Sequence, residues 1–393
     1  MHLLFWILFA IIFYTYFGYG LFLFFIILLK RVFAGKPKPT AIPPDEELPT
    51  VSFVVAAFNE EYILREKIMN TLELDYAPGK MEFIVITDGS SDGSYDIARS
   101  FASVKALHQP ERRGKLAAME RAIEQCKGDI LIFSDANTIL NDEALVRICS
   151  LYADKKVGAV AGEKKVLTPG QSDAAASEGM YWKYESQLKK WDSELYSVVG
   201  AAGELFSVRR SLYVPVPKDT VLDDFMISLR IAEKGYKVVY EPGAYATEFS
   251  SENVQEEYKR KVRIAAGGIQ SILRLPKLML PFPYPVLSFQ YISHRVLRWT
   301  ITPFAMLALL VINIQIVINR PSLNLYSIIL VLQVVFYGMA LLGWWLETRH
   351  MKSKIFFIPY YFCMMNVAVV AGIFRYFSGA QSVKWEKAKR RVA

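Results

Sequence analysis

The chain has 393 residues, 53% of them hydrophobic, and carries a formal net charge of +8. The apolar residues concentrate at the two ends, which predicts one globular domain of roughly 240 residues between membrane spans. In a membrane protein, this basic balance reflects cytoplasmic loops and anionic lipids, and the basic residues lack the patterning of a nucleic-acid-binding surface, so no nucleic-acid partner is expected. Cys126, Cys149 and Cys363 fit no disulfide or metal spacing, which is typical of a reducing compartment.

The N-terminal segment is predicted to anchor the chain in the membrane. Residues 3–29 are almost entirely apolar and long enough to cross a bilayer. They lack a basic n-region and a clear cleavage site, so a membrane helix over 1–30 is favoured over a removed signal peptide. Directly after it come Lys30, Arg31, Lys36 and Lys38. The positive-inside rule then places the N-terminus outside and the following domain in the cytosol, at the cell (inner) membrane. A proline-rich, extended linker over 31–50 follows.

From residue 51 to 251, short apolar runs alternate with helical patterns. Strands are predicted at Val51–Ala57, Phe83–Thr87 and Ile130–Phe133, and helices at Glu61–Leu74, from Ser94, and at Leu116–Cys126. Buried strands joined by helices indicate an α/β domain, a mostly parallel sheet with helices on both faces. Polar residues follow the strand ends, where open α/β sheets bind ligands. They are Asn59, Glu60, Asp88, Asp135 and Asn137.

Two longer amphipathic helices are predicted next. Residues 171–198 carry a stripe at helical spacing that favours core or membrane-interface packing over a sugar platform. The stripe comprises Met180, Tyr184, Leu188, Trp191 and Leu195. Residues 252–275 carry a similar apolar face, with Lys259, Arg260 and Lys261 on the other side. This second helix is expected to rest on the bilayer and to begin an interfacial region over 252–299.

The C-terminal region, residues 300–377, contains three apolar segments. They lie at about 301–318, 325–346 and 355–374. Residues 278–299 are rich in proline and basic residues, which favours an interfacial run over a span. Four spans in all would leave the basic tail 378–393 outside, against the positive-inside rule. Either the last apolar segment is re-entrant, or residues 278–299 do more than lie on the surface. The spans carry almost no charge, which argues against a transporter.

Four polar motifs each allow a structural and a chemical interpretation. Asp88-Gly-Ser has the composition of a tight turn. Asp135-Ala-Asn137 presents two oxygen ligands that suit a divalent cation. Arg113-Gly114-Lys115 precedes a helix, where a lysine and backbone N–H groups meet phosphate or form a solvated turn. Asp223-Asp224 opens a helix, where acids are caps or, in a sugar site, a general base.

In this order and spacing, the motifs resemble the family 2 glycosyltransferases, the group that contains cellulose, chitin, hyaluronan and poly-N-acetylglucosamine synthases. The resemblance runs from about residue 50 to 275 and extends to the flanking spans. It implies a GT-A-type fold with transmembrane helices at both ends. It also implies an inverting enzyme that uses Mg²⁺ or Mn²⁺ and a nucleotide-sugar donor, for which a UDP-sugar is expected.

The resemblance also implies residue roles. It places the donor near Asn59, Glu60, Asp88 and Lys115. It assigns the metal to Asp135 and Asn137. It makes Asp224 the base that activates the acceptor hydroxyl. It puts Gly203, Asp223, Arg260 and Arg263 on the acceptor or diphosphate side, with the Gly200–Gly203 loop and the following Arg209 and Arg210 facing the acceptor.

Two departures from the family pattern stand out. Asn137 brings no charge to the metal site. The Gln-x-x-Arg-Trp motif of the polymer synthases is missing at its usual place, where Arg263 is followed by Ile264. The similar string from His294 to Trp299 is interpreted as an interfacial anchor, because Trp and Arg favour that level.

The leading functional expectation is sugar transfer in polysaccharide or exopolysaccharide synthesis, with a glycan or lipid-linked acceptor, the lipid bilayer and export subunits as partners. One alternative is a non-processive transferase that adds a single sugar to a polyprenyl-phosphate-linked or other lipid acceptor. Another is a catalytically silent membrane subunit that binds nucleotide-sugars. The donor sugar, the acceptor, processivity and oligomeric state stay open, because pocket shape decides selectivity.

Overall fold

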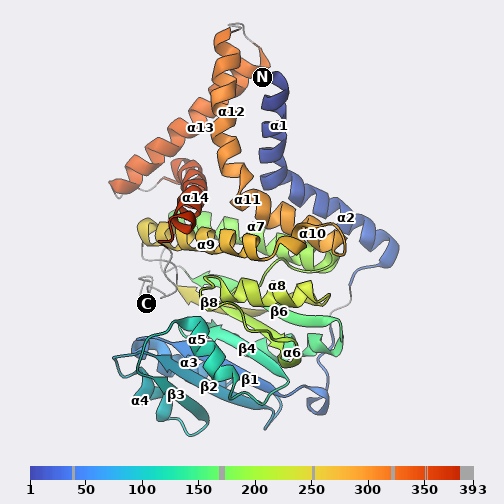
Figure 1. Cartoon of the computed structure of the whole chain (residues 1–393), viewed down its shortest axis with the longest axis vertical. Helices are drawn as coiled ribbons and strands as arrows, with labels where there is room; N and C mark the ends of the chain where they lie inside the picture. The colour runs from blue at the N-terminus through green and yellow to red at the C-terminus, as the bar shows by residue number, and fades with distance from the viewer. Residues whose placement is uncertain are drawn as a thin grey trace.

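A computed structural model describes residues 1–37, 40–167, 173–249, 253–319, 324–349, 351 and 353–380, with side chains described from 182 onward in the helix that begins at 173. The expectations about Lys38, the Met180 side chain and the tail beyond residue 380 lie outside these ranges. Figure 1 shows an α/β domain, a layer of helices across its top, and upright apolar helices above that layer.

One eight-stranded sheet organises the domain. Its strand order is β3-β2-β1-β4-β7-β6-β8-β5. The bounds are β1 Val51–Ala57, β2 Met81–Asp88, β3 Val104–Gln109, β4 Ile130–Asp135, β5 Ile139–Leu140, β6 Val157–Leu167, β7 Leu205–Arg209 and β8 Lys237–Phe249. The first four strands in this order pair in parallel, as do β6 and β8, whereas β7 is antiparallel to both neighbours and β5 to β8. The α/β prediction is confirmed, with antiparallel pairings in one half of the sheet.

Helices cover both faces of the sheet. They are α3 Glu61–Leu72, α4 Ser94–Arg99, α5 Lys115–Ile123, α6 Ala144–Ser150 and α8 Asp223–Glu233. Because strand side chains alternate, β1 sends Val54 into one core, with Met119 of α5 and Met226 of α8. It sends Val55 into the other core, with Ile68 of α3. The strands missed in the sequence are β3, β5, β6, β7 and β8. Of these, β3 is an edge strand whose alternating exposure leaves no continuous apolar run.

Four helices among the described residues have the length and composition of membrane spans. The first is continuous over His2–Ala34, made of α1 His2–Phe13, the π-turn η1 Tyr14–Gly18 and α2 Tyr19–Ala34. The others are α12 Ile301–Asn319, α13 Leu325–Thr348 and α14 Lys354–Phe377. All four match the predicted segments. No further candidate span lies within residues 278–299, all of which the structure describes.

The connecting layer consists of α7 Asp173–Leu195, α9 Val254–Arg274, η5 Pro276–Met279, α10 Pro285–Tyr291, η6 Ile292–Val296 and α11 Leu297–Trp299. It lies between the sheet and the upright helices (Figure 1). The predicted stripe of α7 packs against α2: Leu188 is buried beside Leu23, and the ring of Trp191 lies 5.8 Å from that of Phe24. The packing interpretation of that stripe is therefore confirmed.

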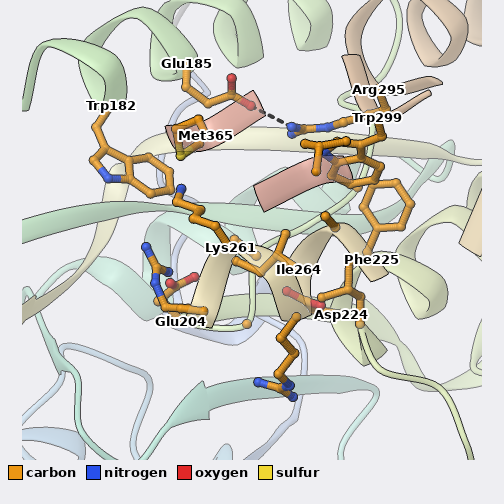
Figure 2. Close-up of a pocket in the computed structure, with 18 of the residues that line it drawn as sticks. Trp182, Glu185, Glu204, Asp224, Phe225, Lys261, Ile264, Arg295, Trp299 and Met365 are labelled. Carbon is orange, nitrogen blue, oxygen red and sulfur yellow. Dashed lines mark ion pairs between the residues drawn. The ribbon is translucent and has the colours of Figure 1, made fainter. Parts of the chain in front are cut away.

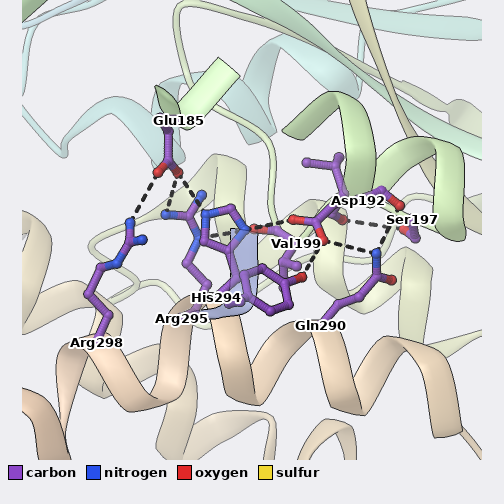
Figure 3. A network of polar contacts seen from close by, with 10 residues as sticks. Glu185, Asp192, Ser197, Val199, Gln290, His294, Arg295 and Arg298 are labelled. Carbon is purple, nitrogen blue, oxygen red and sulfur yellow. Dashed lines mark hydrogen bonds and ion pairs between the residues drawn. The ribbon is translucent and has the colours of Figure 1, made fainter. Parts of the chain in front are cut away.

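The string from His294 to Trp299 is not an interfacial anchor. Figure 3 shows its polar side chains directed at α7. The His294 ring is fully buried between Asp192, 2.6 Å from Nδ1, and Glu185, 3.1 Å from Nε2. Arg295 and Arg298 pair with the same Glu185 carboxylate at 2.9 and 3.1 Å. The buried acids of α7 require these cations, so the side chains turn into the protein and tie the connecting layer together.

The last apolar helix, α14, runs alongside α9. Near its start, Phe357 and Tyr361 pack with Val254 and Tyr258. Near its end, a Cβ on Gly372 would lie 2.5 Å from the Ala265 Cβ, so only glycine permits this approach. Both ends of α14 therefore meet a helix of the connecting layer. This arrangement favours the re-entrant alternative and places the start of the basic tail beside the α/β domain.

This arrangement predicts membrane sidedness. With Cys363 replaced by serine, a cysteine at Ser378 should react with a membrane-impermeant maleimide from the same side as one at Lys218 in the domain. Leu325→Cys, at the loop that joins α12 to α13, should react from the opposite side. Labelling of intact cells and of inverted vesicles measures this. Cys126 and Cys149 are buried, so they should not react with the maleimide in the folded protein. If the cysteine at position 378 were labelled from the same side as the cysteine at position 325, α14 would cross the membrane.

Candidate active site

A cavity of about 860 Å³ lies between the α/β domain and the connecting layer. Its floor comes from the start of α5, the end of β4, the loop at 200–204 and the start of α8. Its walls come from η1, α7, α9, α11 and α14. Figure 2 shows Asp224 and Phe225 on one side of this space and Met365 of α14 across from them. The cavity thus joins the carboxyl edge of the sheet to the apolar helices.

The floor brings together three predicted site residues. Asp135 ends β4, and Lys115 begins α5 directly after Gly114, whose φ of 99° permits the turn. The Lys115 amine lies 2.6 Å from Asp135 Oδ1 and 3.9 Å from Asp223 Oδ2. Burial disfavours the charged amine, but these carboxylates hold the pKa of Lys115 above its usual value. Burial also raises the pKa of Asp135, while Lys115 opposes the rise.

Asp224 stands in the first turn of α8, next to Asp223. Burial and the neighbouring Asp223 charge raise the pKa of Asp224 to about 7, and Lys115 opposes the rise. A Cβ on Gly203 would lie 3.4 Å from Asp224 Oδ2 and 3.1 Å from the Lys115 amine. The glycine therefore keeps the space in front of the carboxylate open. A buried carboxylate that titrates near neutral pH can accept a proton from a hydroxyl.

The expected metal ligands fit a hard cation. Asn137 Oδ1 is buried and has no hydrogen-bond partner among the described residues, and the same holds for Asp223 Oδ2. No group of three or more His, Cys, Asp or Glu side chains that suits a metal occurs in the described ranges. With Asp135, the protein thus offers few oxygen ligands. This is the kind of site where Mg²⁺ takes its remaining ligands from phosphate and water.

Asn59 and Asp88 do not line the cavity; they hold the loops beside it. Asp88 accepts hydrogen bonds from the backbone N–H groups of Arg113 and Gly114, at 2.9 and 2.6 Å, and pairs with Arg121 at 2.6 Å. Its carboxylate thereby fixes the turn that presents Lys115. Asn59 has a φ of 52°, and its Oδ1 accepts from the Ser91 N–H at 2.8 Å, which joins the loops after β1 and β2. Glu60, by contrast, lines the cavity.

The basic side of α9 faces the cavity and not the bilayer. Arg260 and Lys261 line the cavity, and Arg260 forms two 2.9 Å hydrogen bonds with Glu257. Arg263 also lines it, and its guanidinium makes no hydrogen bond or ion pair with the described residues. Burial lowers the pKa of Arg263, while Asp223 and Asp224 oppose that effect. The buried acids of the floor and of α9 itself attract these side chains, so they turn into the protein.

Sequence reasoning missed several cavity residues. Trp299 packs over Gly268 of α9, and its ring lies 5.5 Å from that of Phe225, directly after Asp224. The cavity therefore contains a tryptophan from α11, although position 264 has none. Arg375 of α14 also lines the cavity. A lone arginine near the end of an apolar segment was the only available signal for it. Arg209 lies elsewhere, with its guanidinium on the Val157 and Tyr152 carbonyls at 2.7 and 2.6 Å.

Comparisons with known proteins agree with this geometry. The model of the glycosyltransferase-like family 2 matches residues 49–267. The chain is 27% identical over 236 residues to poly-beta-1,6-N-acetyl-D-glucosamine synthase of Staphylococcus aureus (strain COL), covering 58% of this chain and 57% of that protein. It is 25% identical over 243 residues to the probable glycosyltransferase YdaM of Bacillus subtilis (strain 168), with the same coverage. The chain thus matches somewhat more than half the length of these relatives.

A solved structure shares the fold of the whole chain. The mannosyltransferase PcManGT from Pyrobaculum calidifontis, in complex with GDP-Man and Mn²⁺, is similar with a TM-score of 0.71 and 20% identity, covering 96% of this chain and 100% of that one. This likeness confirms the GT-A-type fold with flanking helices. Since the family model covers more than half of the chain, the protein belongs to the glycosyltransferase-like family 2.

Proposed function

We propose that this glycosyltransferase moves a sugar from a nucleoside-diphosphate donor to an acceptor hydroxyl with inversion, in the cell membrane with its α/β domain in the cytosol. One observation carries the proposal. Asp224, a carboxylate with a pKa of about 7, shares a cavity with Lys115, Asp135 and Asn137. The cavity thus combines a base with groups that suit a diphosphate. The relative named as a polysaccharide synthase and the neighbour solved with GDP-Man support the donor class.

The chemistry follows from the positions of the chain's own groups. Asp224 accepts the proton of the acceptor hydroxyl while the hydroxyl oxygen bonds to the anomeric carbon of the donor. The bond from that carbon to the diphosphate breaks, and its electron pair leaves with the diphosphate. One displacement turns an α-linked donor into a β-linkage. Lys115 and Arg263 supply positive charge near the leaving group. A Mg²⁺ or Mn²⁺ held by Asp135 and Asn137 would add a Lewis acid there.

Replacing the base should abolish most turnover. Asp224→Asn is expected to lower kcat by roughly 10² to 10⁴-fold, the usual size of a general-base contribution, while donor binding is retained. Product release from a panel of UDP- and GDP-sugars measures turnover, and calorimetry measures donor binding. Asp219→Asn, an exposed acid paired with Arg274 at 2.5 Å, is the matched control and should keep full activity. Full activity in Asp224→Asn would refute the assignment.

The raised pKa of Asp224 predicts a pH profile. A base acts only when deprotonated, so kcat should fall as the pH drops below about 7 and level off above it. Asp223→Asn removes the adjacent negative charge, which should lower the pKa of Asp224 and move this limb to lower pH. The pH dependence of kcat in both proteins measures the shift. An unmoved limb would show that another group controls the rate.

Metal removal tests the role of Asp135 and Asn137. EDTA should stop sugar transfer and added Mn²⁺ should restore it, because a divalent cation stabilises the diphosphate leaving group. Asp135→Asn should weaken Mn²⁺ binding, measured by electron paramagnetic resonance in the presence of nucleoside diphosphate. Transfer that persists in EDTA would contradict the metal role. Failure to turn over any donor of the panel, with donor binding intact, would instead support the silent-subunit alternative.

A further inference from the structure

The cavity changes character between its floor and its roof. The floor holds the carboxylates and Lys115. The roof is apolar and aromatic, formed by Tyr16 and Phe17 of η1 and by Phe362, Met365 and Val369 of α14. Phe17 is 65% exposed on the outer surface of the first membrane helix although it also lines the cavity. A residue that belongs to both surfaces marks an opening, so the apolar roof is continuous with the lipid-facing side of these helices.

Cations lie between floor and roof. Arg263 of α9 and Arg375 of α14 both line the cavity, and within the described ranges neither guanidinium has a hydrogen-bond or ion-pair partner. The other arginines of the wall differ, because Arg260 pairs with Glu257 and Arg298 with Glu185. Arg263 has the floor acids Asp223 and Asp224 nearby, whereas no acid is recorded beside Arg375 among the described residues. The Arg375 guanidinium is therefore suited to bind phosphate through two parallel hydrogen bonds.

From this sequence of floor, cations and apolar roof, we infer that the acceptor is an amphiphile, a sugar carried on a lipid phosphate or diphosphate. The inference rests on the proposed function and names its acceptor. The phosphate binds Arg375, the hydrocarbon chain follows the roof between η1 and α14 into the bilayer, and the sugar hydroxyl faces Asp224. In the transfer, that hydroxyl bonds to the anomeric carbon of the donor, its proton goes to Asp224, and the nucleoside diphosphate leaves.

A free polysaccharide fits this roof poorly. Its hydroxyl groups need hydrogen-bond partners, and burying them unpaired is costly. The amide of Asn366 in the roof is already engaged, since its Oδ1 accepts from the Tyr16 hydroxyl at 2.6 Å and its Nδ2 donates to the Phe362 carbonyl at 2.9 Å. Among the described residues, a neutral glycan would also leave the Arg375 guanidinium without an anion. The structure therefore favours the lipid-linked alternative over a polymer that threads through the roof.

An acceptor series tests the inference in the full-length protein in detergent. The donor is the one that gives the fastest hydrolysis without acceptor, a reaction that reports the proposed function by itself. The probes are a long-chain prenyl diphosphate carrying one sugar, the matching prenyl glycoside without phosphate, and a soluble oligosaccharide of the same sugar. Transfer to the first should exceed transfer to the other two by about tenfold or more, the effect of a lost charge-assisted contact.

Two variants test the parts of the acceptor site. Arg375→Gln should raise KM about tenfold for the phosphate-bearing probe and leave KM for the prenyl glycoside unchanged, and Arg375→Lys should restore part of the loss. Met365→Trp should block the roof and reduce transfer to the lipid probe. Val367→Trp is its matched control, because Val367 lies on the same helix, is 56% exposed and does not line the cavity. Thermal unfolding checks that each variant is folded.

The outcomes separate the two proposals. Donor hydrolysis without any preference for the lipid-diphosphate probe would overturn the acceptor inference and leave the proposed function standing. Equal transfer to the soluble oligosaccharide, with Met365→Trp as active as Val367→Trp, would do the same. Absence of hydrolysis and transfer with every donor would refute the proposed function itself. Preference for the lipid-diphosphate probe that Arg375→Gln removes would support the inference.

Discussion

The structure depends on an imbalance of charge at one edge of its sheet. Asp135, Asp223 and Asp224 gather there around a single lysine, Lys115, in a largely buried site. Taking carboxylates out of water favours their protonated forms, and one amine cannot offset three acids. The excess shows as the raised pKa of Asp224, which suits that residue to act as a base. It also makes the site a good place for added positive charge, whether from a divalent cation or from Arg263.

The apolar helices help to build this site. The α/β domain supplies the floor, but the walls come from α7, α9 and α11, and the roof from η1 and α14. Glu185 and Asp192 of α7 hold this arrangement, because His294, Arg295 and Arg298 all converge on them (Figure 3). Burying those acids without the cations would be costly. η6 and α11 are therefore fixed to α7 within the connecting layer, which holds the walls of the cavity in place.

Trp299 shows how such a site can be assembled from separate parts of the chain. At position 264, where the polymer synthases carry a tryptophan, this chain has isoleucine. The ring that lies near Asp224 is that of Trp299 on α11, and Gly268 of α9 leaves room for it. Together with the open guanidinium of Arg375 and the apolar roof, this wall differs from a simple glycan groove. The selectivity of the enzyme is thus expected to reside in the connecting layer and α14, and not in the catalytic floor.

The sequence by itself determined the helices and strands that depend on local residue patterns. Continuous apolar runs identify β1, β2 and β4 and the apolar helices, because burial on both faces or in lipid demands such runs. The order of Asp88, Asp135 and Asp224 was enough to place Lys115, Asp135 and Asp224 in one site, since they follow strand ends or open helices that meet at one edge.

Only the tertiary structure decided which way amphipathic helices turn. The string from His294 to Trp299 was interpreted as an interfacial anchor, but it faces inward because Glu185 and Asp192, far away in the chain, attract it. The basic side of α9 faces the cavity, where Arg260 pairs with Glu257 of the same helix. For the same reason α14 has the composition of a span, yet its packing against α9 brings Arg375 to the cavity. Composition shows which side chains of a helix must be buried, whereas long-range contacts decide which part of the protein buries them.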